Sequence, residues 1–218
     1  MALIDEREAP AKPFFRGRLH EWGLYASVPA GIAAIVAAHS VGAHVAAAIY
    51  AASLTAMYAA SAAYHRLPVS PTVRARLRRL DHSMIYVLIA GTYTPFVSLL
   101  FGVWWAVAIL GVVWTGALLG IAVSIWRFDE WSKLGFALYL ILGWVIVLAL
   151  PVVLHSLSGG QIALLGAGGV VYTLGAIGVA TKWPNPFPRI FGYHEVWHAM
   201  VLAASVCHYI AIVTLLRR

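Results

Sequence analysis

Seven apolar runs dominate this chain of 218 residues, and each is long enough to cross a lipid bilayer. About 20 consecutive apolar residues in a helix cover the roughly 30 Å of hydrocarbon in a membrane. Helices are expected because a lone strand cannot satisfy its backbone hydrogen bonds in lipid. The sequence therefore predicts an all-α membrane protein, a seven-transmembrane helix bundle that forms a single domain over 1–218. The predicted spans lie near 21–40, 43–65, 81–101, 103–125, 133–155, 160–181 and 194–216.

The composition excludes a water-soluble globular protein. Apolar residues make up 62% of the chain and charged residues 11%, whereas soluble domains average roughly 45–50% and about 25%. The net charge of +7 is expected of a membrane protein with basic cytoplasmic loops, so no nucleic-acid partner is inferred from it. The single cysteine, Cys207, rules out an internal disulfide bond. Membrane lipids are the expected partners, and the sequence leaves the oligomeric state open.

The basic residues predict how the bundle is oriented. Thirteen of the 15 lie in the N-terminal segment 1–20 and in the second, fourth and sixth connections. Because Lys and Arg are retained on the cytoplasmic side, the N-terminus is expected in the cytoplasm and the C-terminus outside, the reverse of a G-protein-coupled receptor. The thirteen are Arg7, Lys12, Arg16, Arg18, Arg66, Arg74, Arg76, Arg78, Arg79, Arg127, Lys133, Lys182 and Arg189; Arg217 and Arg218 fall on the other side. The first 20 residues lack the apolar core of a cleavable signal peptide.

Proline and glycine predict local features of the helices. Pro29, Pro95 and Pro151 fall inside predicted spans and should each kink a helix, since proline has no backbone N–H to donate. Gly116 and Gly120 form a GxxxG pair in the fourth span. Such a pair allows two helices to approach closely, and we expect it to serve packing within the bundle rather than dimerisation.

Five polar residues are expected at the same depth in the membrane. Ser61 and His65 lie one helical turn apart at the cytoplasmic end of the second span, and Asp81 opens the third span at that end. His194 and His198 are four residues apart at the start of the seventh span. Residues four apart share a helix face, so each pair can point inward together. Ionisable groups at membrane depth are costly unless they are paired or bind a metal, so they mark a candidate functional site.

Three imidazoles are a suitable ligand set for zinc with an open fourth position, which is typical of catalytic sites. We predict that His65, His194 and His198 bind Zn²⁺, and a bound zinc ion activates water at neutral pH. Asp81 is predicted to orient this water or to accept its proton as general base. The Ser61 hydroxyl is predicted to donate a hydrogen bond to a developing oxyanion. Alternatively, it is predicted to hydrogen-bond a ligand imidazole at the ring nitrogen that does not bind the metal.

The other histidines are interpreted as helix–helix hydrogen-bond donors or interfacial residues. Those near predicted helix ends are His20, His39, His44, His82 and His155. His208 lies ten residues beyond His198 in the seventh span, and is interpreted as a packing residue or as a donor to a ligand from behind.

The seventh span also contains a short match to a metalloprotease motif. His194-Glu195-Val196-Trp197-His198 fits HExxH, in which the glutamate is the general base. This hypothesis, an intramembrane metalloprotease with Asp81 as a remote third ligand, leaves His65 and Ser61 without a role. Outside the protease hypothesis, Glu195 remains a candidate to contact the histidine ligands and hold them in position without binding the metal itself.

Three segments resemble the bacterial hemolysin III family. They are SAAYHRLP (61–68), RRLDHSMIYVLIAGTYTPF (78–96) and GYHEVWHAMVLAASVCHY (192–209). This family is a branch of the group that contains the adiponectin and progestin receptors and the alkaline ceramidases. The resemblance implies a seven-helix bundle with its N-terminus inside and zinc near the cytoplasmic face. The charge asymmetry and the seven apolar spans themselves describe a resident multi-pass protein of the bacterial plasma (inner) membrane.

The same resemblance implies roles for individual residues. In the receptors three histidines bind zinc and an aspartate contacts the zinc-bound water. Carried over by motif, the zinc ligands are His65, His194 and His198, and the supporting and catalytic pair is Ser61 and Asp81. The position of Glu195 within His-x3-His is not fixed in type in the family, which weakens the protease hypothesis.

The leading functional hypothesis is a zinc-dependent hydrolase that cleaves an amide or ester bond of a lipid whose acyl chain lies in a cavity of the bundle. The second hypothesis is a receptor or membrane-homeostasis sensor in which zinc ties helices together without turnover. A cytolytic pore is the third, and it would need a polar stripe along several helices, which the sequence lacks.

Overall fold

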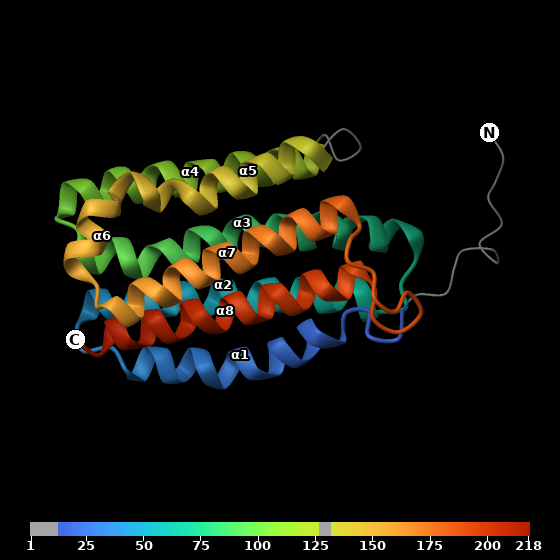
Figure 1. Cartoon of the computed structure of the whole chain (residues 1–218), viewed down its shortest axis with the longest axis horizontal. Coiled ribbons are helices and arrows are strands. Elements are labelled where there is room, and N and C mark those ends of the chain that lie inside the picture. Colours follow the sequence, from blue (N-terminus) through green and yellow to red (C-terminus); the bar gives the residue numbers. More distant parts are fainter. Residues whose placement is uncertain (1–12, 127–131) are drawn as a thin grey trace.

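The computed structural model describes residues 13–126 and 132–218, which form long helices that run side by side (Figure 1). Arg7, Lys12 and Arg127, three of the basic residues used to orient the chain, lie outside the described residues. The helices are α1 (Arg18–Val36), α2 (Val41–Arg66), α3 (Pro71–Leu100), α4 (Val103–Trp126), α5 (Ser132–Trp144), the 3₁₀ helix η3 (Val145–Ala149), α6 (Leu150–Ser156), α7 (Gly159–Thr181) and α8 (Tyr193–Leu216).

Six helical segments of the described chain are long and apolar enough to cross a membrane, so the protein is a multi-pass membrane protein. They are Val41–Arg66, Pro71–Leu100, Val103–Trp126, Ala137–Ser156, Gly159–Thr181 and Tyr193–Leu216. The segment predicted at 21–40 forms α1, which packs against α2 and α8 but is not among these six. Arg18, His20 and Glu21 in its first turn reduce its apolar character.

The proline at position 151 coincides with a break in the predicted fifth span. There α5 ends at Trp144, a 3₁₀ helix follows, and α6 begins at Leu150 with Pro151 in its first turn. Proline is tolerated in the first turn of a helix, where its missing N–H would have no partner. Pro29 and Pro95 instead lie inside α1 and α3, which continue through them.

The connection predicted over 66–80 is much shorter in the structure, because α3 begins at Pro71. The Ser70 side chain caps this helix by accepting a hydrogen bond from the backbone N–H of Val73. Serine before proline is a favourable helix start, and arginine is a good helix former. The arginines between positions 74 and 79 therefore project from the first turns of α3 rather than from a loop.

Most of the described basic residues gather at one end of the bundle, and Arg217 and Arg218 lie at the other. The start of α1, the end of α2, the start of α3, the end of α7 and the start of α8 all lie there, and the C-terminus lies at the opposite end (Figure 1). The segment before α1 also pairs with the segment before α8 at this end, since the backbone N–H groups of Phe14 and Phe15 donate to the carbonyls of Arg189 and Ile190.

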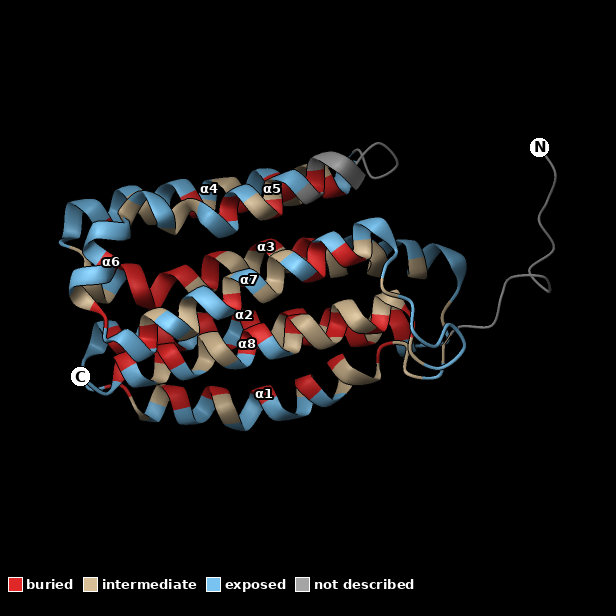
Figure 2. Ribbon diagram, viewed as in Figure 1, coloured by how far each residue is buried: buried red, intermediate tan, exposed pale blue. Residues whose placement is uncertain are grey.

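The outer surface of this bundle is apolar, unlike that of a soluble protein. The outward faces of α4, α5 and α7 expose large apolar side chains such as Leu118, Ile141 and Leu174 (Figure 2). The interior is mainly apolar too, but it also buries polar groups, including Ser61, His198 and Glu195. Exposed apolar surface of this extent requires lipid around the helices, and buried polar groups at this depth require partners.

The two glycines of the GxxxG pair bring helices together within the bundle, as the sequence predicts. A Cβ atom at Gly116 would lie 2.6 Å from Cδ2 of Leu142 on α5. At Gly120 it would lie 2.5 Å from Cζ of Tyr86 on α3, whose side chain is fully buried. The face of α4 that carries both glycines is therefore packed against α3 and α5 within the fold.

Replacing Gly120 by alanine is expected to destabilise the protein by about 1–3 kcal/mol, because the added methyl group would overlap a ring that has no room to move. The measurement is thermal or denaturant unfolding of the purified protein in detergent micelles. Gly111→Ala in the same helix is the matched control, since a Cβ atom there meets nothing within 4 Å. Equal stability of the two variants would contradict the packing described.

Candidate metal centre

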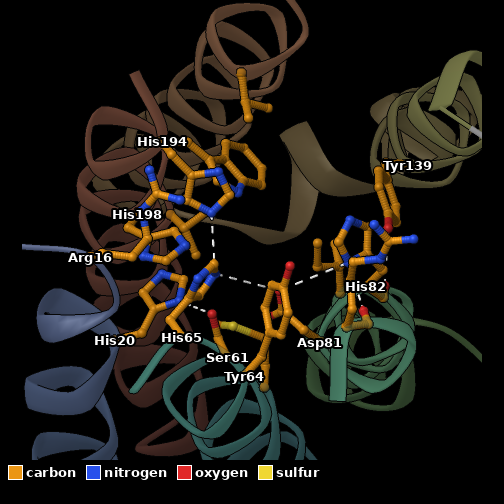
Figure 3. A pocket seen from close by; sticks show the side chains of 16 residues that line it. Arg16, His20, Ser61, Tyr64, His65, Asp81, His82, Tyr139, His194 and His198 are labelled. Carbon is orange, nitrogen blue, oxygen red and sulfur yellow. Dashed lines mark hydrogen bonds and ion pairs between the residues drawn. The ribbon is translucent and has the colours of Figure 1, made fainter. Parts of the chain in front are cut away.

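Three histidines from two helices meet at the end of the bundle that carries the basic residues. His65 comes from the last turn of α2, and His194 and His198 come from the first two turns of α8 (Figure 3). The Nε2 atoms of His65 and His194 lie 3.2 Å apart. The ligand atoms of all three side chains lie within 4.8 Å of one another. The structure therefore places the three predicted ligands together and turned inward.

The donor set fits a metal ion. Two nitrogens that bind one zinc tetrahedrally at about 2.0–2.1 Å stand roughly 3.3–3.4 Å apart, close to the separation of the His65 and His194 atoms. Nδ1 of His198 is buried and has no hydrogen-bond partner among the described residues. A buried polar atom without a partner is costly and calls for an explanation, and a role in metal binding would supply one. Small ring movements would close the set around one cation.

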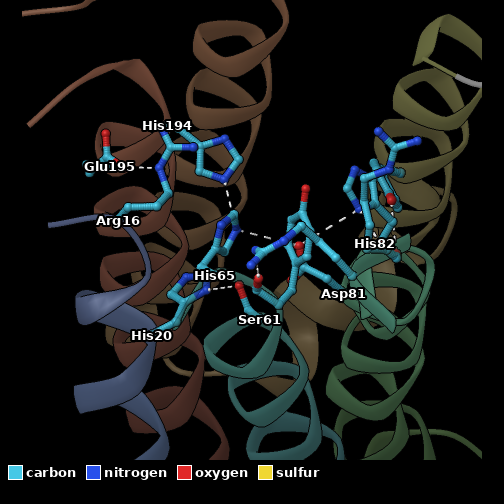
Figure 4. A network of polar contacts seen from close by, with 12 residues as sticks. Arg16, His20, Ser61, His65, Asp81, His82, His194 and Glu195 are labelled. Carbon is cyan, nitrogen blue, oxygen red and sulfur yellow. Dashed lines mark hydrogen bonds and ion pairs between the residues drawn. The ribbon is translucent and has the colours of Figure 1, made fainter. Parts of the chain in front are cut away.

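Asp81 places its carboxylate beside the histidines. Its Oδ2 atom lies 3.8 Å from Nε2 of His65 and 3.8 Å from Nδ1 of His82 (Figure 4). The Nδ1 of His82 also lies 2.8 Å from the carbonyl oxygen of Arg78, to which it donates. Asp81 therefore adjoins the candidate ligands and is the carboxylate in this part of the cavity.

Ser61 has a partner that the sequence analysis does not predict. Its Oγ lies 2.8 Å from Nδ1 of His20, and the tautomer of the ring decides which of the two donates. His20 stacks on the ring of His198, with ring centroids 3.8 Å apart and an interplanar angle of 11°. Of the two interpretations of His20, the structure therefore favours a helix–helix hydrogen bond over an interfacial position, and the side chain is also buried against a candidate ligand.

Glu195 is fully buried behind the two α8 histidines, and both of its carboxylate oxygens are engaged. Oε1 accepts from Nε of Arg16, and Oε2 accepts from the backbone N–H of Gly192 at 2.9 Å. This side chain does not line the cavity at the histidines. The geometry disfavours the protease hypothesis, because a general base must reach the water that it activates.

His208 is not brought to the histidine cluster. It lies ten residues beyond His198 on α8, which corresponds to about 15 Å along the helix axis. Its Nε2 lies 3.3 Å from the carbonyl oxygen of Leu165 on α7. Of the two roles predicted for His208, the structure favours packing between α7 and α8.

A cavity of about 380 Å³ contains the whole constellation (Figure 3). Six helices (α1, α2, α3, α5, α7 and α8) and the turn before α1 enclose it, with α2, α3 and α8 supplying most of its polar groups. All five predicted site residues line it, together with two arginines and two more histidines. The lining residues are Arg16, His20, Met57, Ser61, Tyr64, His65, Arg78, Asp81, His82, Ile85, Tyr139, Val179, His194, Trp197, His198 and Val201.

A bundle of apolar helices that encloses three imidazoles and a carboxylate at one end defines a multi-pass membrane protein with a candidate metal centre. The chain belongs to the haemolysin-III-related family, whose model matches residues 9–209. It is 35% identical over 192 residues to "Hemolysin-3" of Bacillus cereus, covering 85% of this chain and 83% of that protein. It is 32% identical over 196 residues to the "Hemolysin-3 homolog" of Bacillus subtilis (strain 168), covering 88% and 89%.

Two arginines and two histidines that line the cavity were not predicted as part of the site: Arg16, His20, Arg78 and His82. His82 follows Asp81 directly, and the shared depth of the two residues was the available signal. His20 and Arg16 precede the first apolar run, and nothing in their spacing relates them to α2 or α8. Their predicted position on the cytoplasmic side, the side of the histidine cluster, was the only hint.

Proposed function

We propose that this protein is a zinc-dependent hydrolase that cleaves an amide or ester bond of a membrane lipid. The observation that carries the proposal is that three imidazoles and one carboxylate, from α2, α3 and α8, line one cavity of about 380 Å³. Three nitrogen ligands with space beside them favour a catalytic over a closed structural zinc site. His65, His194 and His198 would hold the ion.

A bound zinc ion would supply the Lewis acidity that activates a water molecule and polarises a carbonyl group. Asp81 accepts the proton of the attacking water and returns it to the leaving amine or alcohol. One water molecule is consumed, the acyl C–N or C–O bond breaks, and a fatty acid leaves with the amine or alcohol. The Ser61 hydroxyl, engaged with His20, supports the ligands in this proposal rather than the substrate.

Two further cavities support a lipid as the substrate. One of about 100 Å³ shares Ile85, Tyr139 and Trp197 with the metal-centre cavity. Another of about 150 Å³ shares Thr92 and Trp144 with the second one, and lies farther from the histidines. Apolar side chains dominate both linings, so an acyl chain could follow them between α3, α5 and α7 with its carbonyl at Asp81.

The proposed orientation places the metal centre at the cytoplasmic face of the bacterial inner membrane. It rests on the helix ends that carry Arg66, Arg74 and Lys182, which share the end of the bundle with the histidines. Lys and Arg are retained on the cytoplasmic side. In this proposal α1 is a seventh span, the N-terminus is cytoplasmic and the C-terminus is outside.

The test is acyl release by the purified protein in liposomes that contain an acyl-labelled N-acyl amide lipid or an acyl-labelled ester lipid. The zinc-loaded protein is expected to release fatty acid, the chelator-treated protein to lose this activity, and added zinc to restore it. Undiminished release by the metal-free protein would contradict the proposal. Zinc that raises the unfolding temperature with no release from either lipid would instead favour the receptor or sensor hypothesis.

A further inference from the structure

The first turn of α1 and the turn before it contact both halves of the candidate metal centre. A Cβ atom at Gly17 would lie 2.5 Å from Cβ of His65, and its φ of +77° is a conformation that favours glycine. Arg16, the residue before it, binds the carboxylate of Glu195, which directly follows His194 on α8 (Figure 4). One short segment therefore packs on α2 and α8 at the point where each carries its ligands.

His20 makes the most specific of these contacts. Its ring lies parallel to the ring of His198 at a centroid distance of 3.8 Å, and its Nδ1 is fixed by Ser61 on α2. The side chain of His20 is only 3% exposed. The His198 ring therefore has a flat partner on one face, and this partner is itself held by a hydrogen bond to a third helix.

We propose that His20 is a positioning residue for the candidate metal centre: anchored by Ser61, it fixes the plane of the His198 ring and so sets the affinity and geometry of metal binding. This inference rests on the proposed zinc site. Ligand imidazoles in metalloproteins are held by outer partners, and loss of such a partner typically lowers metal affinity about 10–100-fold. In this protein the outer contact of the His198 ring is the stacked ring of His20, which is itself held by Ser61.

A residue that only fills space would behave differently from a positioning residue. Phenylalanine at position 20 preserves a flat ring against His198 but cannot bind Ser61. If packing were the whole role, His20→Phe would match the native protein. If positioning depends on the anchored ring, His20→Phe and Ser61→Ala should show the same partial defect, and His20→Ala a larger one.

The experiment measures zinc affinity of the full chain in detergent by chelator competition, and the absorption spectrum after loading with Co²⁺, which reports ligand geometry. His20→Ala is expected to weaken zinc binding about 10–100-fold and to change the Co²⁺ spectrum. His20→Phe and Ser61→Ala are expected to fall between this variant and the native protein. Glu21→Gln is the matched control, because it removes the exposed α1–α2 ion pair of Glu21 with Arg66 without touching a candidate ligand.

Native affinity and a native Co²⁺ spectrum in His20→Phe and Ser61→Ala would overturn the inference while leaving the zinc site intact. Equal defects in Glu21→Gln and His20→Ala would also overturn it, since general loosening of α1 would then explain both. If the native protein binds zinc no better than a variant that lacks all three candidate ligands, the proposed metal centre falls, and the inference falls with it. Should His20→Ala fail to fold, the two milder variants still decide the question.

Discussion

Replacing His194 by alanine is expected to take the purified protein from about one zinc ion per chain to almost none. Its Nε2 lies 3.2 Å from that of His65, so the substitution leaves two of three nitrogens from the chain. Loss of a direct ligand should cost more than the roughly 10–100-fold in affinity that loss of an outer partner costs. Acyl release should fall to the level of protein-free liposomes, and elemental analysis checks the metal content.

His44→Ala is the matched control for this variant. His44 is an exposed histidine at the opposite end of α2, and its Nδ1 donates to the carbonyl oxygen of Ser40, four residues earlier in the chain. The control should keep full metal content and full activity. Full zinc content in both variants would show that the ion is held elsewhere in the protein.

Replacing Asp81 by asparagine is expected to reduce acyl release about 10²–10⁴-fold while zinc content stays unchanged, because a general base contributes on that order. Asparagine keeps the size of the side chain and can still hydrogen-bond, but it cannot accept the proton of the attacking water. The carboxylate lies 3.8 Å from Nε2 of His65, beside the candidate ligands. The measurement is the rate of release per zinc-loaded chain under saturating lipid.

The outcome for Asp81→Asn separates two roles of this carboxylate. Activity within a fewfold of native would exclude Asp81 as general base. Loss of zinc together with activity would make it a metal ligand instead of a proton acceptor. Asp81→Glu, which retains the carboxylate on a longer side chain, is expected to recover part of the rate and serves as the chemical control.

The apolar runs were enough to predict most of the fold. Four predicted spans match helices of the structure to within two residues at both ends: 43–65 with α2, 103–125 with α4, 160–181 with α7 and 194–216 with α8. The start of α3 was missed because hydropathy reports where lipid begins, whereas a capped, arginine-rich helix continues into the headgroup region. Hydropathy likewise cannot report whether α1, with charged residues in its first turn, is a span.

The sequence predicted the candidate metal ligands but not the residues that pack around them. Spacing of four residues defines one helix face, so His194 with His198 and Ser61 with His65 could be paired from the sequence. The stacking of His20 on His198 depends on how α1 packs against α2 and α8, and a single sequence carries no signal for such a contact. The burial of Glu195 under Arg16 depends on the same packing, as does the exclusion of this glutamate from the cavity.

The two halves of the histidine cluster are 129 residues apart in the chain, one on α2 and the other on α8. During biosynthesis the ribosome delivers α2 to the membrane long before α8, and until then the nascent protein offers a single imidazole from this set. A partly inserted chain therefore lacks the complete set of histidines proposed to bind a divalent ion. Metal acquisition would follow docking of α8, and bound metal would distinguish completed molecules from stalled or truncated ones.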